Sequence, residues 1–238
     1  MLKYRKLFKK LFELSEKNSS KDLFSSTTFL RENLNSKNPL VILDVGANRG
    51  QSAQRYLKLF PGCRIHSFEP FKESYDILKQ IQYDNLSTYQ YGLSDRNEIQ
   101  TFYLNGASPT NSLLKIDERA PDVWGDLAAL RAKSITTCEF RTLDWFLETH
   151  DLNNVNFMKL DVQGAEFKVL NGATKALKEK KIGLVQIEFL FVPTYQEQKS
   201  FDYYIEFFKR YNYQLSMITD IERMGDAVFQ ADLFFIQN

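Results

Sequence analysis

Apolar and polar positions follow two different periods from residue 40 to the end of the chain. Apolar runs such as LVILDVG at 40–46 and NFMKLDV at 156–162 are typical of strands buried on both faces of a sheet. Between such runs, apolar residues return every three or four positions, which indicates amphipathic helices. Further strands are predicted at 64–69, 87–93, 99–104, 136–142, 182–190, 213–219 and 227–237, and helices at 51–60, 71–82, 143–149, 165–179 and 200–211.

Strands that alternate with helices of this length predict an α/β fold, with a mostly parallel sheet and helices on both of its faces. The strands at 213–219 and 227–237 leave almost no room for a helix between them. We therefore expect antiparallel pairing at the end of the chain. A polar, irregular stretch at 105–134 interrupts the alternation, and a stretch of this length is expected to be functional or to contain a helix of its own.

The first 35 residues are predicted to form a helical extension, and residues 36–238 the main domain. Apolar residues recur at spacings of three and four from Tyr4 to Leu14, between basic residues. A second helical piece is predicted from Ser20 to Leu34. We expect the basic first helix to pack on the domain or a partner, and its charge leaves oligomerisation and weak contact with an anionic membrane surface open.

Composition narrows the class of protein. The chain has 238 residues, a net charge of +1, 43% hydrophobic residues, 20 Phe and 12 Tyr, which is enough for one large core. Disordered and disulfide-scaffold classes are therefore excluded, and no bulk attraction to nucleic acid is expected. Cys63 and Cys138 stand far apart, and no signal peptide or membrane-spanning run is evident. These features predict a cytoplasmic protein with free thiols.

Candidate chemistry lies where the first two strands end, because ligands of open parallel sheets bind beyond the carboxyl ends of the strands. The first strand ends in Asp44-Val-Gly46-Ala-Asn48-Arg-Gly50, whose glycines allow a tight turn and a close approach to a ligand. The second strand ends in Glu69-Pro70, 25 residues after Asp44. An acid at that point can accept both hydroxyls of a ribose, so the pair indicates a nucleoside-bearing cofactor.

The spacing of the loop discriminates between such cofactors. A nicotinamide site requires G-x-G-x-x-G, whereas this loop has G-x-x-x-G with an acid before the first glycine. The carboxylate of Asp44 would repel a pyrophosphate and suits a ligand with positive charge, such as the amino group of S-adenosylmethionine. A tight strand-to-helix turn without a ligand is the alternative explanation of the loop alone.

Three more acids lie at the ends of later strands. Asp161 is expected beside the first strand and Glu166 one turn into the next helix, where either could accept a proton or cap the helix. Glu188 ends another strand, and an ordinary ion pair explains an acid at this position as well as a functional role does. No His, Cys, Asp or Glu cluster has the spacing of metal ligands, so no essential metal is expected.

Taken together, these motifs resemble the FkbM family of S-adenosylmethionine-dependent methyltransferases. The matching pieces occur in order between residues 40 and 190. They are LDVGANRGQS (43–52), FEP (68–70), GLSD (92–95), NSL (111–113), FRTLD (140–144), KLDVQGAEFKVLNGA (159–173) and IEF (187–189). The resemblance implies a class I, Rossmann-like methyltransferase sheet of seven mostly parallel strands, the last one antiparallel.

The resemblance also implies roles for individual residues. The cofactor-binding set would be Asp44, Gly46, Asn48, Gly50, Ser52, Glu69, Pro70, Ser94, Asp95 and Asp161. Within it, Glu69 would bind the ribose, Ser94 and Asp95 would lie near the adenine, and Asp161 would approach the methyl group. Asn111, Ser112 and Glu188 would face the acceptor.

The function expected is transfer of a methyl group to a hydroxyl of a sugar, a glycan or a secondary metabolite, with Asp161 or Glu166 as the base. The stretch at 105–134, with Trp124 and the nearby Tyr103, would form the acceptor wall. A nicotinamide oxidoreductase and a non-catalytic interaction protein of this fold are the alternatives. A nucleic-acid methyltransferase is disfavoured, since neither a basic stripe nor an Asn-Pro-Pro-Tyr motif is present.

Overall fold

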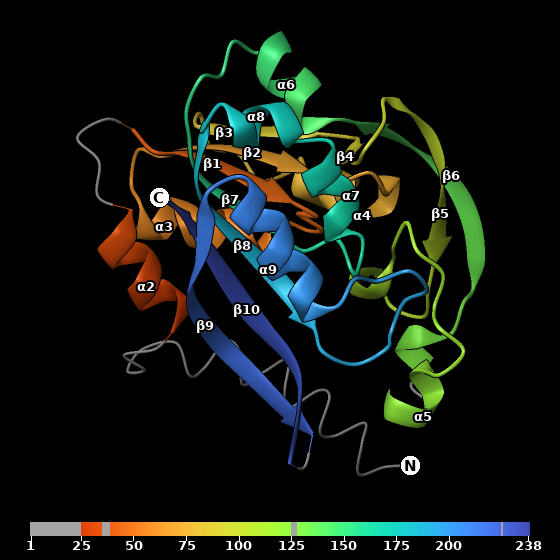
Figure 1. Cartoon of the computed structure of the whole chain (residues 1–238). Coiled ribbons are helices and arrows are strands. Elements are labelled where there is room, and N and C mark those ends of the chain that lie inside the picture. Colours follow the sequence, from red (N-terminus) through yellow and green to blue (C-terminus); the bar gives the residue numbers. More distant parts are fainter. Residues whose placement is uncertain (1–24, 35–38, 125–127, 225) are drawn as a thin grey trace.

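The computed structural model describes residues 25–34, 39–124, 128–224 and 226–238. These residues form a seven-stranded sheet and a smaller three-stranded sheet beside it (Figure 1). In spatial order the main sheet contains β3 (Leu86–Tyr89), β2 (Arg64–Phe68), β1 (Val41–Val45), β7 (Val155–Leu160), β8 (Ile182–Leu190), β10 (Ala227–Gln237) and β9 (Tyr213–Met224).

The strand directions confirm the predicted fold class. The five strands from β3 to β8 pair in parallel, and β10 is antiparallel to both of its neighbours, β8 and β9. This is the mostly parallel, seven-stranded sheet expected of a class I methyltransferase. The strand order reverses between β1 and β7, and such a switch point opens a crevice at the carboxyl ends of the strands.

Helices cover both faces of the main sheet. One face packs against α2 (Ser26–Asn33) and α3 (Gln51–Leu59), where Phe29 contacts Phe234 and Tyr56 contacts Phe157. Figure 1 shows α2 beside the hairpin of β9 and β10. The other face packs against α6 (Leu143–Thr149), α7 (Glu166–Asn171), α8 (Thr174–Lys178) and α9 (Phe201–Arg210). A further helix, α4 (Lys72–Leu78), follows β2.

The predicted strand at 87–93 is wrong, because this segment forms two strands in different sheets. It contains β3 and then β4 (Gly92–Leu93), which pairs with β6 (Ser134–Arg141) of the small sheet. There β6 also pairs with β5 (Glu98–Leu104) in antiparallel register. A Cβ atom on Gly92 would lie 2.3 Å from the Phe140 ring, so the switch of sheet depends on a close contact.

The predicted helix at 165–179 is also interrupted. It is divided into α7 and α8 at Gly172, where a Cβ atom would lie 2.0 Å from the carbonyl oxygen of Ser94. The predicted helix at 71–82 ends at Leu78. The stretch at 105–134 contains the short helix α5 (Ala120–Trp124) and single turns at Ser108–Thr110 and Ala128–Leu130.

The predicted N-terminal extension lies mostly outside the described residues. Its described part is α2, which begins after Ser25, whose hydroxyl accepts a hydrogen bond from the amide of Thr28. None of the helices within the described ranges is both long and apolar enough to cross a membrane.

We expect the substitution Phe208→Ala to destabilise the fold by about 3–5 kcal/mol, because it leaves a cavity in the core. Phe208 is fully buried, and its ring stacks on Phe235 of β10 at 4.0 Å between centroids. Urea unfolding followed by circular dichroism measures the loss. The control Ile99→Thr changes a side chain that is 73% exposed and should leave the free energy of unfolding within about 0.5 kcal/mol. Equal effects of the two changes would contradict this account of the core.

Candidate active-site cleft

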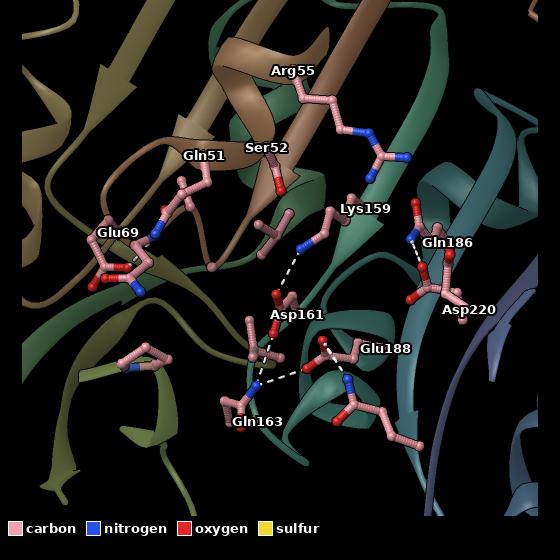
Figure 2. Close-up of a pocket in the computed structure, with 18 of the residues that line it drawn as sticks. Gln51, Ser52, Arg55, Glu69, Lys159, Asp161, Gln163, Gln186, Glu188 and Asp220 are labelled. Atoms are coloured by element: carbon pink, nitrogen blue, oxygen red, sulfur yellow. Dashed lines mark hydrogen bonds and ion pairs between the residues drawn. The ribbon is translucent and has the colours of Figure 1, made fainter. Parts of the chain in front are cut away.

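A single cleft of about 1660 Å³ runs along the carboxyl ends of the central strands. It is lined by the loop after β1, the end of β2, the loop after β7 and the end of β8, and it continues to β9 and β10. Figure 2 shows Glu69 on one side of the cleft, Gln186 and Asp220 on the other, and Lys159 and Asp161 between them. The cleft therefore occupies the switch point that the strand order creates.

The loop after β1 is held against the end of β2 by backbone contacts. The amides of Gly46 and Ala47 both donate to the carbonyl of Phe68, at 3.1 and 3.0 Å. Gly46 has a φ of +83°, and a Cβ atom there would lie 1.9 Å from the carbonyl oxygen of Asp161. Only glycine allows this turn and this approach of two loops, which leaves backbone exposed on the floor of the cleft.

Glu69 fixes the same corner from the other side. Its Oε2 accepts from the amide of Asn48 and its Oε1 from the amide of Phe71, each at 2.9 Å. Burial raises the pKa of Glu69 to about 7 despite these two donors. The carboxyl group thus stands in a fixed orientation at the rim of the cleft, with lone pairs left to accept from a ligand.

The end of the cleft beside Glu69 is apolar. Leu93, Phe102 and Phe140 line it together with Pro70 and Leu113. Three of these, Leu93, Phe102 and Phe140, belong to the small sheet, which therefore supplies one side of the cleft. A flat apolar ring system fits such a surface.

A buried lysine lies in the centre of the cleft. The Nζ atom of Lys159 is 2.7 Å from Oδ2 of Asp161, and Lys159 pairs across the sheet with Asp44 of β1. Burial alone would lower the pKa of Lys159, but the two carboxylates raise it above its ordinary value. The lysine therefore stays charged, and in turn it holds the pKa of Asp161 below its ordinary value against the effect of burial.

Gln163 links Asp161 to a second carboxyl group. Its Nε2 atom donates to Oδ1 of Asp161 and to Oε2 of Glu188, both at 2.9 Å (Figure 2). The other oxygen of Glu188 accepts from Gln230 at 2.9 Å. Burial and the charge of Asp161 raise the pKa of Glu188 well above its ordinary value. The two neighbouring carboxyl groups are thus driven in opposite directions, which is a common arrangement in acid–base sites.

Eight of the residues expected from the sequence line this cleft. They are Gly46, Asn48, Ser52, Glu69, Pro70, Asn111, Asp161 and Glu188. The Oδ1 atom of Asn111 accepts from the amide of Asn105. The structure therefore brings together the ends of the strands predicted at 40–46, 64–69, 156–162 and 182–190.

The other expected residues lie behind the surface of the cleft. Asp44 is 0% exposed, and Ser67 donates to its Oδ2 at 3.4 Å. The carboxyl group of Asp44 faces Lys159, and burial raises the pKa of Asp44 to about 6. Gly50, the residue before α3, packs against the side chain of Ile81. Asp44 therefore does not line the cleft in this structure, and its contact with a ligand stays a prediction.

Glu166 and Ser112 hold the loop after β7. Oε1 of Glu166 accepts from the amides of Val162 and Gly164, at 3.1 and 3.2 Å, and burial raises its pKa to about 7. The hydroxyl of Ser112 donates to the carbonyl of Gln163 at 2.7 Å. Neither side chain lines the cleft. Glu166 thus holds two amides of the loop before α7 rather than amides of the helix itself, and its role as a base stays a prediction.

Two further pairs of residues named from the sequence lie outside the cleft lining. The hydroxyl of Ser94 donates to Asp95 at 3.1 Å, and the two residues follow β4 of the small sheet rather than a strand of the main sheet. Trp124 donates to Thr194 and packs edge-on against Phe229, and Tyr103 pairs with Ser112. Residues 105–134 do contribute Ser108, Pro109, Asn111 and Leu113 to the cleft, but not the expected aromatic side chains.

Sequence reasoning missed several cleft residues. Lys159, Gln163 and Gln186 lie in or directly after strands, and each lines the cleft. Lys159 and Asp161 are two positions apart, so the alternation of a strand could have placed both on one face. Nothing in the local sequence indicates the pairing of Gln186 with Asp232, since their hydrogen bond joins strands 46 residues apart. Over the described ranges, no group of three His, Cys, Asp or Glu residues is arranged to hold a metal ion.

Comparison with known proteins identifies the family that this cleft fits. The family described as methyltransferase FkbM domain matches residues 44–215. The 2-O-methyltransferase NoeI of Sinorhizobium fredii is 27% identical over 153 residues, which are 59% of this chain and 60% of that protein. Methyltransferase 1 of Beauveria bassiana is 27% identical over 147 residues, 55% of this chain and 57% of that protein. The chain thus spans less than two thirds of either relative.

The structure of M. capricolum TrmK in complex with S-adenosylhomocysteine superimposes with a TM-score of 0.49 at 9% identity, over 91% of this chain and 70% of that one.

We expect Gly46→Ala to destabilise the protein more than Gly62→Ala. Both glycines have a left-handed φ, +83° and +86°, so each alanine costs about 1–2 kcal/mol in backbone strain. Only at Gly46 does the new Cβ atom overlap another loop, which adds about 1–3 kcal/mol, because nothing lies within 4 Å of a Cβ atom at Gly62. Thermal and urea unfolding measure both. Indistinguishable losses would show that the contact between the two loops is not tight.

Proposed function

The chain belongs to the FkbM methyltransferase domain family, and on this premise we propose that it transfers the methyl group of S-adenosylmethionine to a hydroxyl of a small-molecule or glycan acceptor. The observation that carries the proposal is the corner where Glu69 holds the amide of Asn48 beside the open backbone of Gly46. The name of the Sinorhizobium fredii relative, a 2-O-methyltransferase, supports oxygen as the atom that is methylated. We place the catalytic domain at residues 36–238, which include the matched range.

The residues of the cleft fit S-adenosylmethionine, the methyl donor. Glu69 accepts from the ribose hydroxyls, and the apolar end formed by Leu93, Phe102 and Phe140 takes the adenine. The backbone of Gly46, which lines the cleft without a side chain, takes the methionine part. No second glycine follows Gly46 at the spacing that would cradle a pyrophosphate, which disfavours a nicotinamide dinucleotide.

Asp161 and Glu188 have different roles in the proposed reaction. When bound, S-adenosylmethionine supplies a methyl group on a positively charged sulfur, whose leaving group is a neutral thioether. Asp161 keeps its negative charge beside Lys159 and stabilises positive charge in the centre of the cleft. Glu188 takes the proton of the acceptor hydroxyl as the oxygen forms its bond to carbon and the carbon–sulfur bond breaks. The raised pKa of Glu188 makes it the stronger base of the two.

We expect the protein to bind S-adenosylhomocysteine with micromolar affinity, and Glu69→Ala to weaken binding by roughly tenfold or more, about 1.4 kcal/mol. Calorimetric titration of the purified protein measures both values, with NAD as the competing ligand. The control Glu73→Ala changes an exposed acid of α4 outside the cleft and should bind normally. Binding of NAD alone would overturn the proposed function. Binding of S-adenosylhomocysteine without methyl transfer to any compound in a broad acceptor screen would favour a non-catalytic protein of this fold.

We expect Glu188→Gln to lower the rate of methyl transfer by roughly 10²–10⁴-fold while binding of S-adenosylhomocysteine is retained. Because a base must be deprotonated, the wild-type rate should rise with pH through a pKa above the ordinary range of a carboxyl group. This acidic limb should be absent from the profile of the variant. Single-turnover assays with radiolabelled donor across pH 5–9 give both results. A variant with the wild-type rate and profile would exclude Glu188 as the base.

A further inference from the structure

The end of the cleft farthest from Glu69 has no role in the donor site described above. It lies between α3 and the hairpin of β9 and β10, and we call it the hairpin arm. It is lined by Arg55 and Lys58 of α3, Gln186 of β8, Asp220 of β9 and Asp232 of β10. The cleft as a whole, about 1660 Å³, exceeds the roughly 300–1,000 Å³ typical of a site for one ligand. The hairpin arm therefore has room for a second ligand.

Gln186 is the feature of the hairpin arm that points to a ligand. Its side chain is only 3% exposed, and its Nε2 atom donates to Oδ2 of Asp232 at 2.6 Å. Its Oε1 atom is buried and accepts no hydrogen bond from any described residue. Buried amide oxygens are nearly always paired, so an unpaired one that faces a cleft is best explained by a donor that the ligand brings.

A β-bulge directs a carboxylate to the same place. Asp232 lies opposite Thr219 and Gln230 opposite Glu222, so two residues of β9, Asp220 and Ile221, face the single residue between them on β10. Asp220 has a left-handed φ of +48°, and Figure 2 shows its side chain beside Gln186. Burial and the charge of the nearby Asp220 raise the pKa of Asp232 to about 8.

The charges of the hairpin arm disfavour an ionic ligand. Arg55 and Lys58 are exposed on the side of α3, and neither forms an ion pair with a described residue. Arg55 donates instead to the hydroxyls of Ser26 and Thr27. The acids of β9 and β10 face them, so a ligand with one strong charge would be repelled by one side. A neutral molecule with many hydroxyl groups can donate to the acids and accept from the basic groups.

We propose that the hairpin arm binds the acceptor, and that this acceptor is a saccharide whose neighbouring hydroxyls bond to Gln186, Asp220 and Asp232. The proposal rests on the proposed function and names the acceptor class and its subsite. Asp232 lies opposite Glu188 in the pairing of β10 with β8, so a saccharide in the hairpin arm has a further hydroxyl next to the base. The lining of the hairpin arm contains no aromatic side chain among the described residues, which disfavours a flat aromatic acceptor.

The test uses the full chain, radiolabelled S-adenosylmethionine and a panel of free mono- and disaccharides together with phenolic compounds. For the best saccharide, Gln186→Leu should raise KM by roughly tenfold or more, because a site for a hydroxyl discriminates strongly when its partner is removed. Asp220→Asn, a change on an exposed side chain, should raise KM several-fold. The control Gln214→Leu lies on an exposed position of β9 outside the cleft and should leave KM unchanged.

Calorimetry with S-adenosylhomocysteine separates failure of this proposal from failure of the proposed function. Unchanged donor binding together with a raised saccharide KM in both variants, and an unchanged KM in the control, supports the hairpin arm as the acceptor subsite. Methylation of the phenolic compounds alone, or of no compound although the donor product binds, overturns the proposal and leaves the donor site intact. An unchanged saccharide KM in Gln186→Leu and Asp220→Asn also overturns it. Absence of donor binding in the wild type would instead overturn the proposed function.

Discussion

The buried ammonium group of Lys159 is the constraint on which the arrangement of the cleft depends. An ammonium group without a partner in the interior is very costly, so β7 can carry Lys159 only where carboxylates surround it. Asp161 supplies one at 2.7 Å and Asp44 another on the neighbouring strand. The two strands at the switch point are thus joined by charge as well as by their backbone, and the carboxyl ends that form the cleft are fixed relative to each other.

The ion pair with Lys159 distinguishes Asp161 from Glu188, the other carboxyl group in the centre of the cleft. Asp161 is stabilised as an anion by its partner, whereas buried Glu188 accepts from the neutral amides of Gln163 and Gln230 and lies beside the negative charge of Asp161. Opposite shifts of the two pKa values follow from this difference in partners. One strand therefore supplies a permanent negative charge and the next a proton acceptor, although both residues are acids near the end of a buried strand.

The sequence predicts the main sheet well because its signals are local. Runs of apolar residues and helical spacing indicate most of its strands, and the short connection before β10 requires antiparallel pairing. The break of 87–93 into two strands depends instead on Gly92 packing against Phe140, 48 residues away. The same holds for the site, where Gly46 and Glu69 follow from motifs, whereas the contacts of Glu166 with two loop amides are visible only in the structure. Gln186 looks like an ordinary polar strand residue until β10 is placed beside it.

The approach of Gly46 to the carbonyl oxygen of Asp161 has a consequence for how proteins of this kind diverge. The two loops lie more than 100 residues apart in the chain, yet neither can gain a side chain or an insertion at this point without displacing the other. Because the contact is with the backbone of Asp161, position 46 should stay glycine in related sequences whichever side chain stands at 161. A relative that has lost this glycine will have rebuilt both loops, and with them the site that they enclose.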